Sequence, residues 1–257
     1  MPNPPDILSL LDRIRCITTE EERNSLVDSL VSIERTSILS FVNAHAVNLC
    51  SGSDEVLTAF RGADVILRDG IGVKAAFTAL GREPGWNMNG TDFIPALLTA
   101  MAPKRVAVFG TSEPWLSRGA ERIALAGGHT VVERMDGFQP IDAYVESARR
   151  CRPDVILLAM GMPRQEVVAN TLKTAIERPA LIINGGAIVD FLAGRVERAP
   201  LPIQRIGLEW LYRLAREPRR LFGRYVIGGV LFAHTILTLR RIAPRPGATA
   251  AHAYKEL

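Results

Sequence analysis

The chain has 257 residues, of which 47% are hydrophobic and 23% charged, so it can bury a sizeable core. Its three isolated cysteines, without CxxC spacing, argue against a disulfide framework or a cysteine zinc site and indicate a reducing compartment. The net charge of +4 is unevenly spread, because residues 204–241 hold eight arginines and two glutamates and the remainder is therefore net negative. A basic C-terminal segment on a mildly acidic body predicts a negatively charged partner.

Short apolar, β-branched runs alternate with helical patterns along most of the chain. The predicted strands are 38–42, 64–67, 105–110, 130–134, 154–161 and 180–186. The predicted helices lie near 53–61, 71–80, 91–102, 114–126, 140–151 and 163–177. This alternation predicts an α/β fold with a largely parallel sheet and helices on both faces. In such sheets ligands bind outside the carboxyl ends of the strands.

After about residue 200 the pattern predicts helices alone. One helix is expected from about 202 to 216, and a second from Pro218, a residue suited to the first helical position, to about 241. We therefore divide the chain into a body (1–200), a helical appendage (201–242) and a tail (243–257) that is expected to be disordered.

The appendage contains an uncharged stretch, 226–239, that raises the question of a membrane. As a helix it would rise only about 21 Å, which is too short to span the roughly 30 Å of hydrocarbon. It is expected to lie on a membrane, with Leu231 and Phe232 among its lipid contacts, or to pack on the body. Because the N-terminus has an acidic residue and prolines instead of a signal peptide's pattern, we expect a cytoplasmic protein.

Polar residues or glycines follow four of the predicted strands. "FVNAH" presents Asn43, "ILRDGIG" presents Asp69, "LAMGMPRQE" presents Gln165, and "INGGAIVD" presents Gly186 and Asp190. Each of them alone could be an ordinary helix cap or tight turn. Because they fall together on one predicted edge of the sheet, they are also candidates for a single site.

Several familiar chemistries are missing from the sequence. It has no P-loop, no three-glycine dinucleotide fingerprint and no G-x-S-x-G elbow. The four histidines lack the paired spacing of metal ligands, and no Asp-x-Asp pair occurs, so we expect neither a metal nor another cofactor. An enzyme that handles phosphates here would neutralise them with arginines and backbone amides.

Seven segments of the sequence, taken in order, resemble those of a known protein family. The segments are "FVNAHAVN", "RDGIGVKAA", "NMNGTDFIP", "DGF", "GMPRQE", "NGGAIVDFLAGRVERAP" and "GLEWLYRLAREPRRLFGRY". In order and approximate spacing, over about residues 38–226, they resemble the WecG/TagA/CpsF glycosyltransferase family. The resemblance implies a Rossmann-like body whose appendage touches the inner face of the cell membrane, peripherally, and completes the active site.

The same resemblance implies an activity. It is that of an inverting hexosyltransferase, which moves a hexose-type sugar from a UDP-sugar to an undecaprenyl-pyrophosphate-linked saccharide during synthesis of a bacterial exopolysaccharide, capsule, O-antigen or teichoic acid. A hexose, an N-acetylmannosamine or a uronic acid donor is compatible with the motifs. No nucleic acid partner is expected, and a homo-oligomer is possible.

The implied catalytic residues are Asp69, as general base, and Asn43. Arg213 and Arg220 are expected to stabilise the departing UDP, because arginine is the best stabiliser available without a metal. The implied substrate-binding residues are Phe138, Gln165, Gly186, Asp190, Thr91, Asp92, Arg219 and Arg224.

Two positions depart from the family's pattern. Phe138 stands where a tyrosine is usual and could still stack on uracil. Phe41 stands where the family often has a threonine, so a role for that hydroxyl would require Ser40 to replace it.

Two other classes of protein remain as alternatives. A nicotinamide-dependent oxidoreductase could use the same type of sheet, although the glycine fingerprint is missing. A non-catalytic module could dock on an anionic membrane or on nucleic acid through the arginines, which also have a simpler interpretation as a solvated basic face. That module would leave Asp69 and the glycine-rich strand ends without a role.

Overall fold

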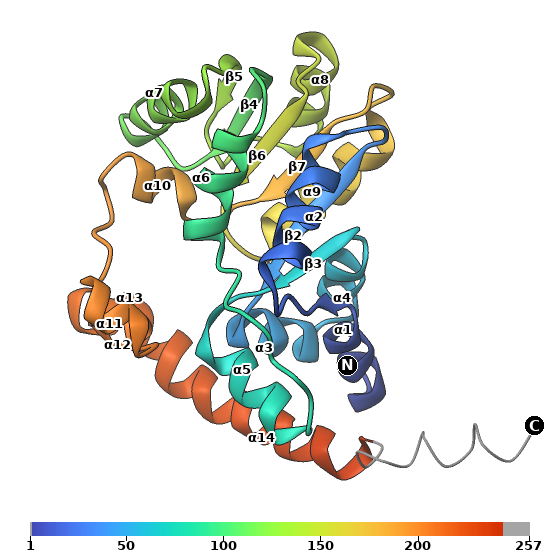
Figure 1. Cartoon of the computed structure of the whole chain (residues 1–257), viewed down its shortest axis with the longest axis vertical. Coiled ribbons are helices and arrows are strands. Elements are labelled where there is room, and N and C mark those ends of the chain that lie inside the picture. Colours follow the sequence, from blue (N-terminus) through green and yellow to red (C-terminus); the bar gives the residue numbers. More distant parts are fainter. Residues whose placement is uncertain (1, 244–257) are drawn as a thin grey trace, which may run out of the picture.

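The protein, described by a computed structural model over residues 2–243, is built on a parallel sheet (Figure 1). Within these residues the sheet has seven strands in the order β1-β3-β2-β7-β6-β4-β5, all parallel. The strands are β1 (Ile14–Arg15), β2 (Ser37–Val42), β3 (Val65–Arg68), β4 (Arg105–Gly110), β5 (Thr130–Met135), β6 (Val155–Ala159) and β7 (Leu181–Asn184). The predicted α/β fold is confirmed. Residues 244–257 of the predicted tail lie outside the described residues.

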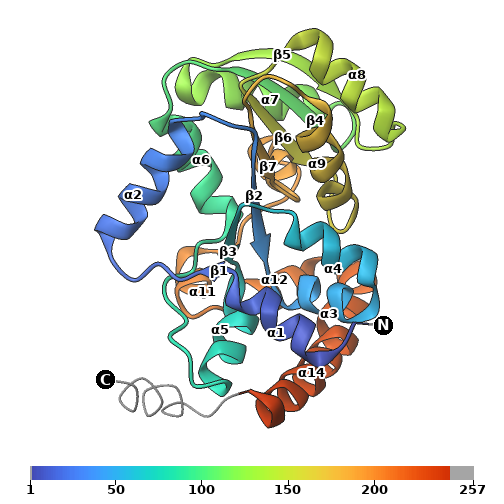
Figure 2. The same ribbon diagram turned by 90° about the vertical axis from the view of Figure 1, so that its right-hand side faces the viewer.

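Helices cover both faces of the sheet, as Figure 2 shows for α2 and α6 on one side and α4 and α9 on the other. The helices of the body are α1 (Pro4–Asp12), α2 (Glu20–Val31), α3 (Ala44–Gly52), α4 (Asp54–Arg61), α5 (Gly70–Ala79), α6 (Gly90–Ala100), α7 (Trp115–Gly127), α8 (Ile141–Cys151), α9 (Arg164–Ala175) and α10 (Ile188–Leu192). Successive residues of β6 belong to opposite core clusters, with Ile156 in one and Leu157 in the other. A strand buried on both faces reads as a continuous apolar run, which explains "VILLA" in β6.

The sheet has two halves. Strands β1, β2 and β3 form one half, β4 to β7 form the other, and they meet where β2 pairs with β7. Because all strands are parallel, their carboxyl ends lie along one edge. The junction of the halves is therefore the place where residues from both can line one crevice.

The appendage consists of α11 (Leu201–Arg205), α12 (Glu209–Arg216), α13 (Pro218–Phe222), the π-helical turn η1 (Gly223–Ile227) and α14 (Gly228–Ile242). The single helix expected over 202–216 is wrong, because the chain turns between α11 and α12 at Gly207, whose φ is +75°. This left-handed conformation suits glycine and ends a helix. The helix expected from Pro218 is confirmed and runs to Ile242 through the π-helical turn.

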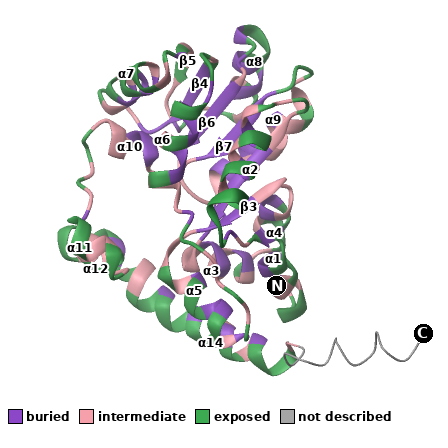
Figure 3. Cartoon of the chain, viewed as in Figure 1, coloured by how far each residue is buried: buried purple, intermediate pink, exposed green. Residues whose placement is uncertain are grey.

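One face of α14 packs on the body, against α1, α3 and α5 (Figure 3). Phe232, Ile236 and Leu239 are buried there and belong to a core cluster of the body. The expectation that Phe232 contacts lipid is therefore wrong, since only 8% of it is exposed, whereas Leu231 is 56% exposed. The outer face of the helix exposes the apolar residues Val230, Leu231 and Leu237, and its last turn exposes Arg240 and Arg241.

By length and composition, the helical run Pro218–Ile242 could cross a membrane. The estimate of about 21 Å covered only its uncharged part, whereas the whole run has 25 residues. A single helix of this kind is weak evidence for a membrane span, and the packing of α14 on the body fits a helix that lies along a surface.

Candidate active site

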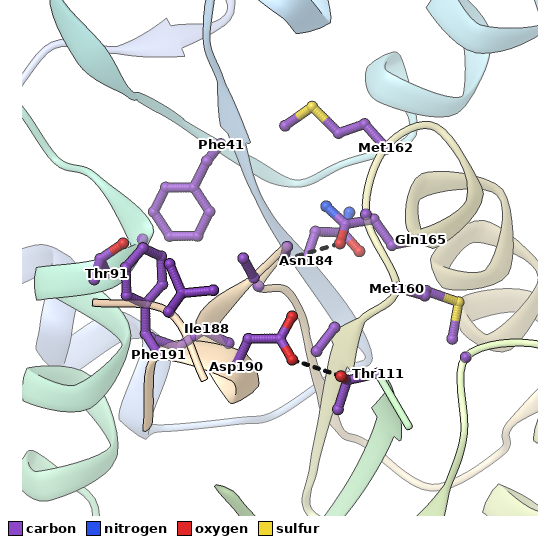
Figure 4. Close-up of a pocket in the computed structure, with 18 of the residues that line it drawn as sticks. Phe41, Thr91, Thr111, Met160, Met162, Gln165, Asn184, Ile188, Asp190 and Phe191 are labelled. Atoms are coloured by element: carbon purple, nitrogen blue, oxygen red, sulfur yellow. Dashed lines mark hydrogen bonds between the residues drawn. The ribbon is translucent and has the colours of Figure 1, made fainter. Parts of the chain in front are cut away.

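A cavity of about 420 Å³ lies at the carboxyl ends of the strands, where the two halves of the sheet meet. Figure 4 shows part of its wall, with Asn184 and Gln165 beside Asp190 and Thr111. The predicted residues that line it are Asn43, Asp69, Thr91, Phe138, Gln165, Gly186, Asp190, Arg213, Arg220 and Arg224. Residues of the body and of the appendage thus share one cavity.

Asn43 holds Asp69 at the ends of two neighbouring strands. The Asn43 amide Nδ2 donates a hydrogen bond to Oδ2 of Asp69 at 3.3 Å, and its Oδ1 accepts one from the backbone N–H of Ala46 at 3.1 Å. Asn43 is therefore also the cap of α3. Asp69 occupies the capping position of α5 but makes no capping hydrogen bond with its side chain, so its carboxyl group is available to the cavity.

The environment of Asp69 suits a proton acceptor. Burial raises the pKa of the Asp69 carboxyl above its ordinary value, while the hydrogen bond from Asn43 and the charges of Arg224, Arg213 and Arg68 oppose this rise. A carboxylate with a raised pKa is a stronger base, and the nearby cations favour its ionised form.

The appendage brings guanidinium groups to the same place. Arg213 lies over the ring of Phe191, with its guanidinium carbon 5.5 Å from the ring centroid. Among the described residues, the Nε atoms of Arg213 and Arg224 are buried without a hydrogen-bond partner. Burial lowers the pKa of Arg224, with the charge of Arg213 acting in the same direction. Buried N–H donors without a partner are costly, so this arrangement fits an anionic ligand.

His45 lies beside these cations in the cavity wall. Burial, assisted by the charge of Arg224, lowers the pKa of His45 to about 4. The imidazole is therefore neutral at neutral pH, which suits a hydrogen-bonding side chain better than an acid.

The opposite side of the cavity is fixed by hydrogen bonds that Gln165 of α9 and Asp190 of α10 accept from neighbouring loops. Gln165 is buried, and its Oε1 accepts a hydrogen bond from the backbone N–H of Gly186 at 2.9 Å. Asp190 accepts one from Thr111 Oγ1 at 2.6 Å. Phe138 follows β5 and is 80% exposed, so its ring is free to cover a ligand.

Ser40 does not line the cavity and so does not replace the hydroxyl that the family's threonine would present there. Its side chain is fully buried, and its Oγ accepts a hydrogen bond from Asn184 Nδ2 at 2.6 Å. Asn184 and Phe41 do line the cavity, so Ser40 reaches it only through Asn184.

Two predicted residues are not brought to the cavity. Asp92 accepts hydrogen bonds from Arg198 Nη2 at 2.6 Å and from Asn89 Nδ2 at 2.8 Å, and so ties α6 to the segment before the appendage. Arg219 is exposed on α13 outside the cavity wall. Conversely, sequence reasoning missed Thr111, Asn184 and Arg195 as lining residues, although Asn184 and Arg195 lie within a quoted motif.

No group of three or more His, Cys, Asp and Glu side chains in the described part of the chain is placed to hold a metal ion. The cationic side chains that line this cavity are those of Arg195, Arg213, Arg220 and Arg224. They come from both the body and the appendage.

A parallel α/β sheet with a carboxylate and several arginines at one cavity is typical of a protein that binds an anionic ligand beside a proton acceptor. The chain belongs to the glycosyl transferase WecG/TagA/CpsF family, whose model matches residues 8–245. It is similar to the N-acetylglucosaminyldiphosphoundecaprenol N-acetyl-beta-D-mannosaminyltransferase of Bacillus spizizenii, at 28% identity over 191 residues that cover 73% of each chain. The predicted family is confirmed, and the protein is a glycosyltransferase.

Proposed function

We propose that the protein is an inverting glycosyltransferase that moves a sugar from a UDP-sugar to a saccharide linked to undecaprenyl pyrophosphate. The observation that carries the proposal is the cavity that Asp69 of the body shares with Arg213, Arg220 and Arg224 of the appendage. The name of the Bacillus spizizenii relative describes a diphosphoundecaprenol-linked acceptor and an N-acetylmannosamine donor residue. It supports the acceptor class, and it makes an N-acetylhexosamine as reasonable a donor sugar as the predicted hexose.

In this mechanism Asp69 accepts the proton of the acceptor hydroxyl while the hydroxyl oxygen attacks the anomeric carbon of the donor. The bond from that carbon to the β-phosphate oxygen breaks, and its electron pair leaves with UDP. Attack from the face opposite UDP inverts the anomeric centre. The charge that gathers on the diphosphate is stabilised by Arg213, Arg220 and Arg224, which is the role of preorganised charged donors.

The appendage also suggests how a membrane-borne acceptor reaches the cavity. On the outer face of α14, Val230, Leu231 and Leu237 are exposed, and Arg240 and Arg241 follow in its last turn. Apolar residues beside arginines favour the interface of an anionic membrane. A membrane-bound α14 would then hold the mouth of the cavity, with Arg220 and Arg224 just before this helix, close to the lipid-linked acceptor.

The test is a screen for release of UDP from UDP-glucose, UDP-N-acetylglucosamine, UDP-N-acetylmannosamine and UDP-glucuronic acid. The acceptor is N-acetylglucosamine linked through pyrophosphate to a short lipid, kept soluble in detergent. We expect release that depends on the acceptor with one of these donors, and a product whose anomeric configuration is inverted. Absence of acceptor-dependent release with all four donors, or a retained configuration, would refute the proposal.

A further inference from the structure

Arg195, which lies in the loop after α10, is held in place by Asp190 and Thr111. Its Nη1 donates to Asp190 Oδ1 and to Thr111 Oγ1, both at 3.2 Å, and its backbone N–H donates to the carbonyl of Asp190 at 2.9 Å. Among the described residues these are the only hydrogen bonds of its guanidinium. Arg195 is thus fixed by one nitrogen, while Nη2 and Nε are left for a ligand.

Thr111, which supports Arg195, has an unusual backbone. Its φ is +45°, a left-handed conformation that a β-branched residue rarely adopts. The strained turn is held by two backbone hydrogen bonds of 3.0 Å, from Thr111 N–H to Ala159 and from Gly137 N–H to Thr111. Strain of this kind persists where the surrounding structure enforces it, and it gathers at ligand sites.

Arg195 faces the arginines of the appendage. Together with Arg213 and Arg220 it lines both the main cavity and a second cavity of about 530 Å³ beside it. Glu217 also lines the second cavity, and its carboxylate accepts hydrogen bonds from Arg220. The hydrogen bond from Arg220, and then the charges of Arg220, Arg213 and Arg195, lower the pKa of the Glu217 carboxyl group. Because Asp190 and Glu217 offset two of these three positive charges, a net positive charge is left for an anionic ligand.

We propose that Arg195 binds the diphosphate of the UDP-sugar donor from the body side, together with Arg213 and Arg220 of the appendage. This inference rests on the proposed function. It places one phosphate-binding cation in the body, so the appendage is not the only source of positive charge. An arginine in this role should contribute to the binding of the diphosphate and not to that of uracil or ribose.

A purely structural role predicts a different result. The ion pair between Arg195 and Asp190 is partly solvent-exposed, with 46% and 20% of the two side chains accessible, and such pairs contribute little to the stability of the fold. Arg195→Gln should therefore fold. The chain offers a matched control in Arg178, which pairs with Asp154 at 2.7 Å with 48% and 21% of the side chains accessible and which lines neither of the two cavities.

The experiment is calorimetric titration of the full-length protein with UDP, UMP and uridine. For Arg195→Gln we expect UDP affinity to fall about 10- to 100-fold, the range for losing hydrogen bonds to a charged group. Uridine affinity should stay within about twofold of wild type. Arg195→Lys, which keeps the charge but not the planar guanidinium, should lose less affinity for UDP than Arg195→Gln does. Arg178→Gln should bind UDP like wild type.

Two results would overturn the inference while leaving the proposed function intact. The first is wild-type UDP affinity in Arg195→Gln. The second is an equal loss for uridine and UDP, which would show that Arg195 only shapes the nucleoside pocket through Asp190. If the wild-type protein bound no UDP at all, the proposed function itself would fail. Thermal unfolding of each variant checks its fold, and Arg195→Lys supplies the answer if Arg195→Gln is unstable.

Discussion

Glu166, on α9 next to Gln165, predicts a pH dependence of stability. It is fully buried, its Oε1 accepts a hydrogen bond from Gln165 Nε2 at 2.8 Å, and its Oε2 has no partner among the described residues. Burial raises the pKa of the Glu166 carboxyl from 4.5 to about 7, although the hydrogen bonds from Gln165 and from its own backbone oppose this.

The direction and the size of this pH dependence follow from proton binding to Glu166. Between pH 4.5 and about pH 7, Glu166 carries its proton in the folded state but has lost it in the unfolded chain. The free energy of unfolding therefore falls as the pH rises through this window and stays low above it. At about 1.4 kcal/mol for each pH unit, the gap between the two pKa values corresponds to a loss on the order of 3 kcal/mol.

Glu166→Gln tests this reasoning, because an amide keeps an acceptor for Gln165 but cannot ionise. Unfolding in urea at pH 5 and at pH 8 should show a variant with stability close to wild type at pH 5 and greater stability at pH 8, by up to about 3 kcal/mol. Glu146→Gln, which changes an exposed glutamate of α8, is the control and should show no such gain. A change of the same size at both pH values would refute the argument.

Three further predictions concern the site and the membrane. Asp69→Asn should lower turnover by about 10²- to 10⁴-fold while UDP still binds, and near wild-type turnover would contradict the assignment of the base. Turnover should survive EDTA, and a loss that Mg²⁺ or Mn²⁺ restores would reveal a metal site. Leu231→Asp should reduce co-sedimentation with anionic lipid vesicles, and unchanged co-sedimentation would count against α14 as the lipid contact.

The parallel sheet could be predicted because buried strands leave uninterrupted apolar runs, whereas other elements left little signal. Residues 4–31 received no predicted element, although they form α1, β1 and α2. Strand β1 has only two residues, and α2 is mostly polar, with Leu26 and Leu30 as its buried residues. Helix α3 was missed because a single residue, Asn43, separates it from β2 and serves both as the strand's end and as the helix's cap.

Most of the site could be predicted because parallel strands bring their carboxyl ends together, whichever side chains follow them. The exceptions depend on long-range contacts. Asp92 is bound by Arg198, which is 106 residues away in the sequence. Thr111 stands out by its left-handed backbone conformation, and Arg195 by its hydrogen bonds to Thr111 and Asp190. Neither feature can be predicted from the order of the residues alone.

The central claim is that the arginines of the appendage belong to the active site and do more than bind the protein to the membrane. Removing the appendage would test this poorly, because it would also uncover the core residues that pack on Phe232 and Leu239. Single substitutions are cleaner. Arg213 lines the cavity and Arg219 does not, yet both lie in the appendage and each substitution removes one positive charge.

The most direct measurement is therefore the turnover of Arg213→Gln and Arg219→Gln on a detergent-soluble acceptor, without a membrane. We predict that Arg213→Gln lowers turnover by about 10²- to 10³-fold, the range for losing one preorganised charge-stabilising group, and that Arg219→Gln stays within about threefold of wild type. Equal turnover of the two variants, whether both are active or both impaired, would contradict the claim that the cavity-lining arginine acts on the reacting diphosphate.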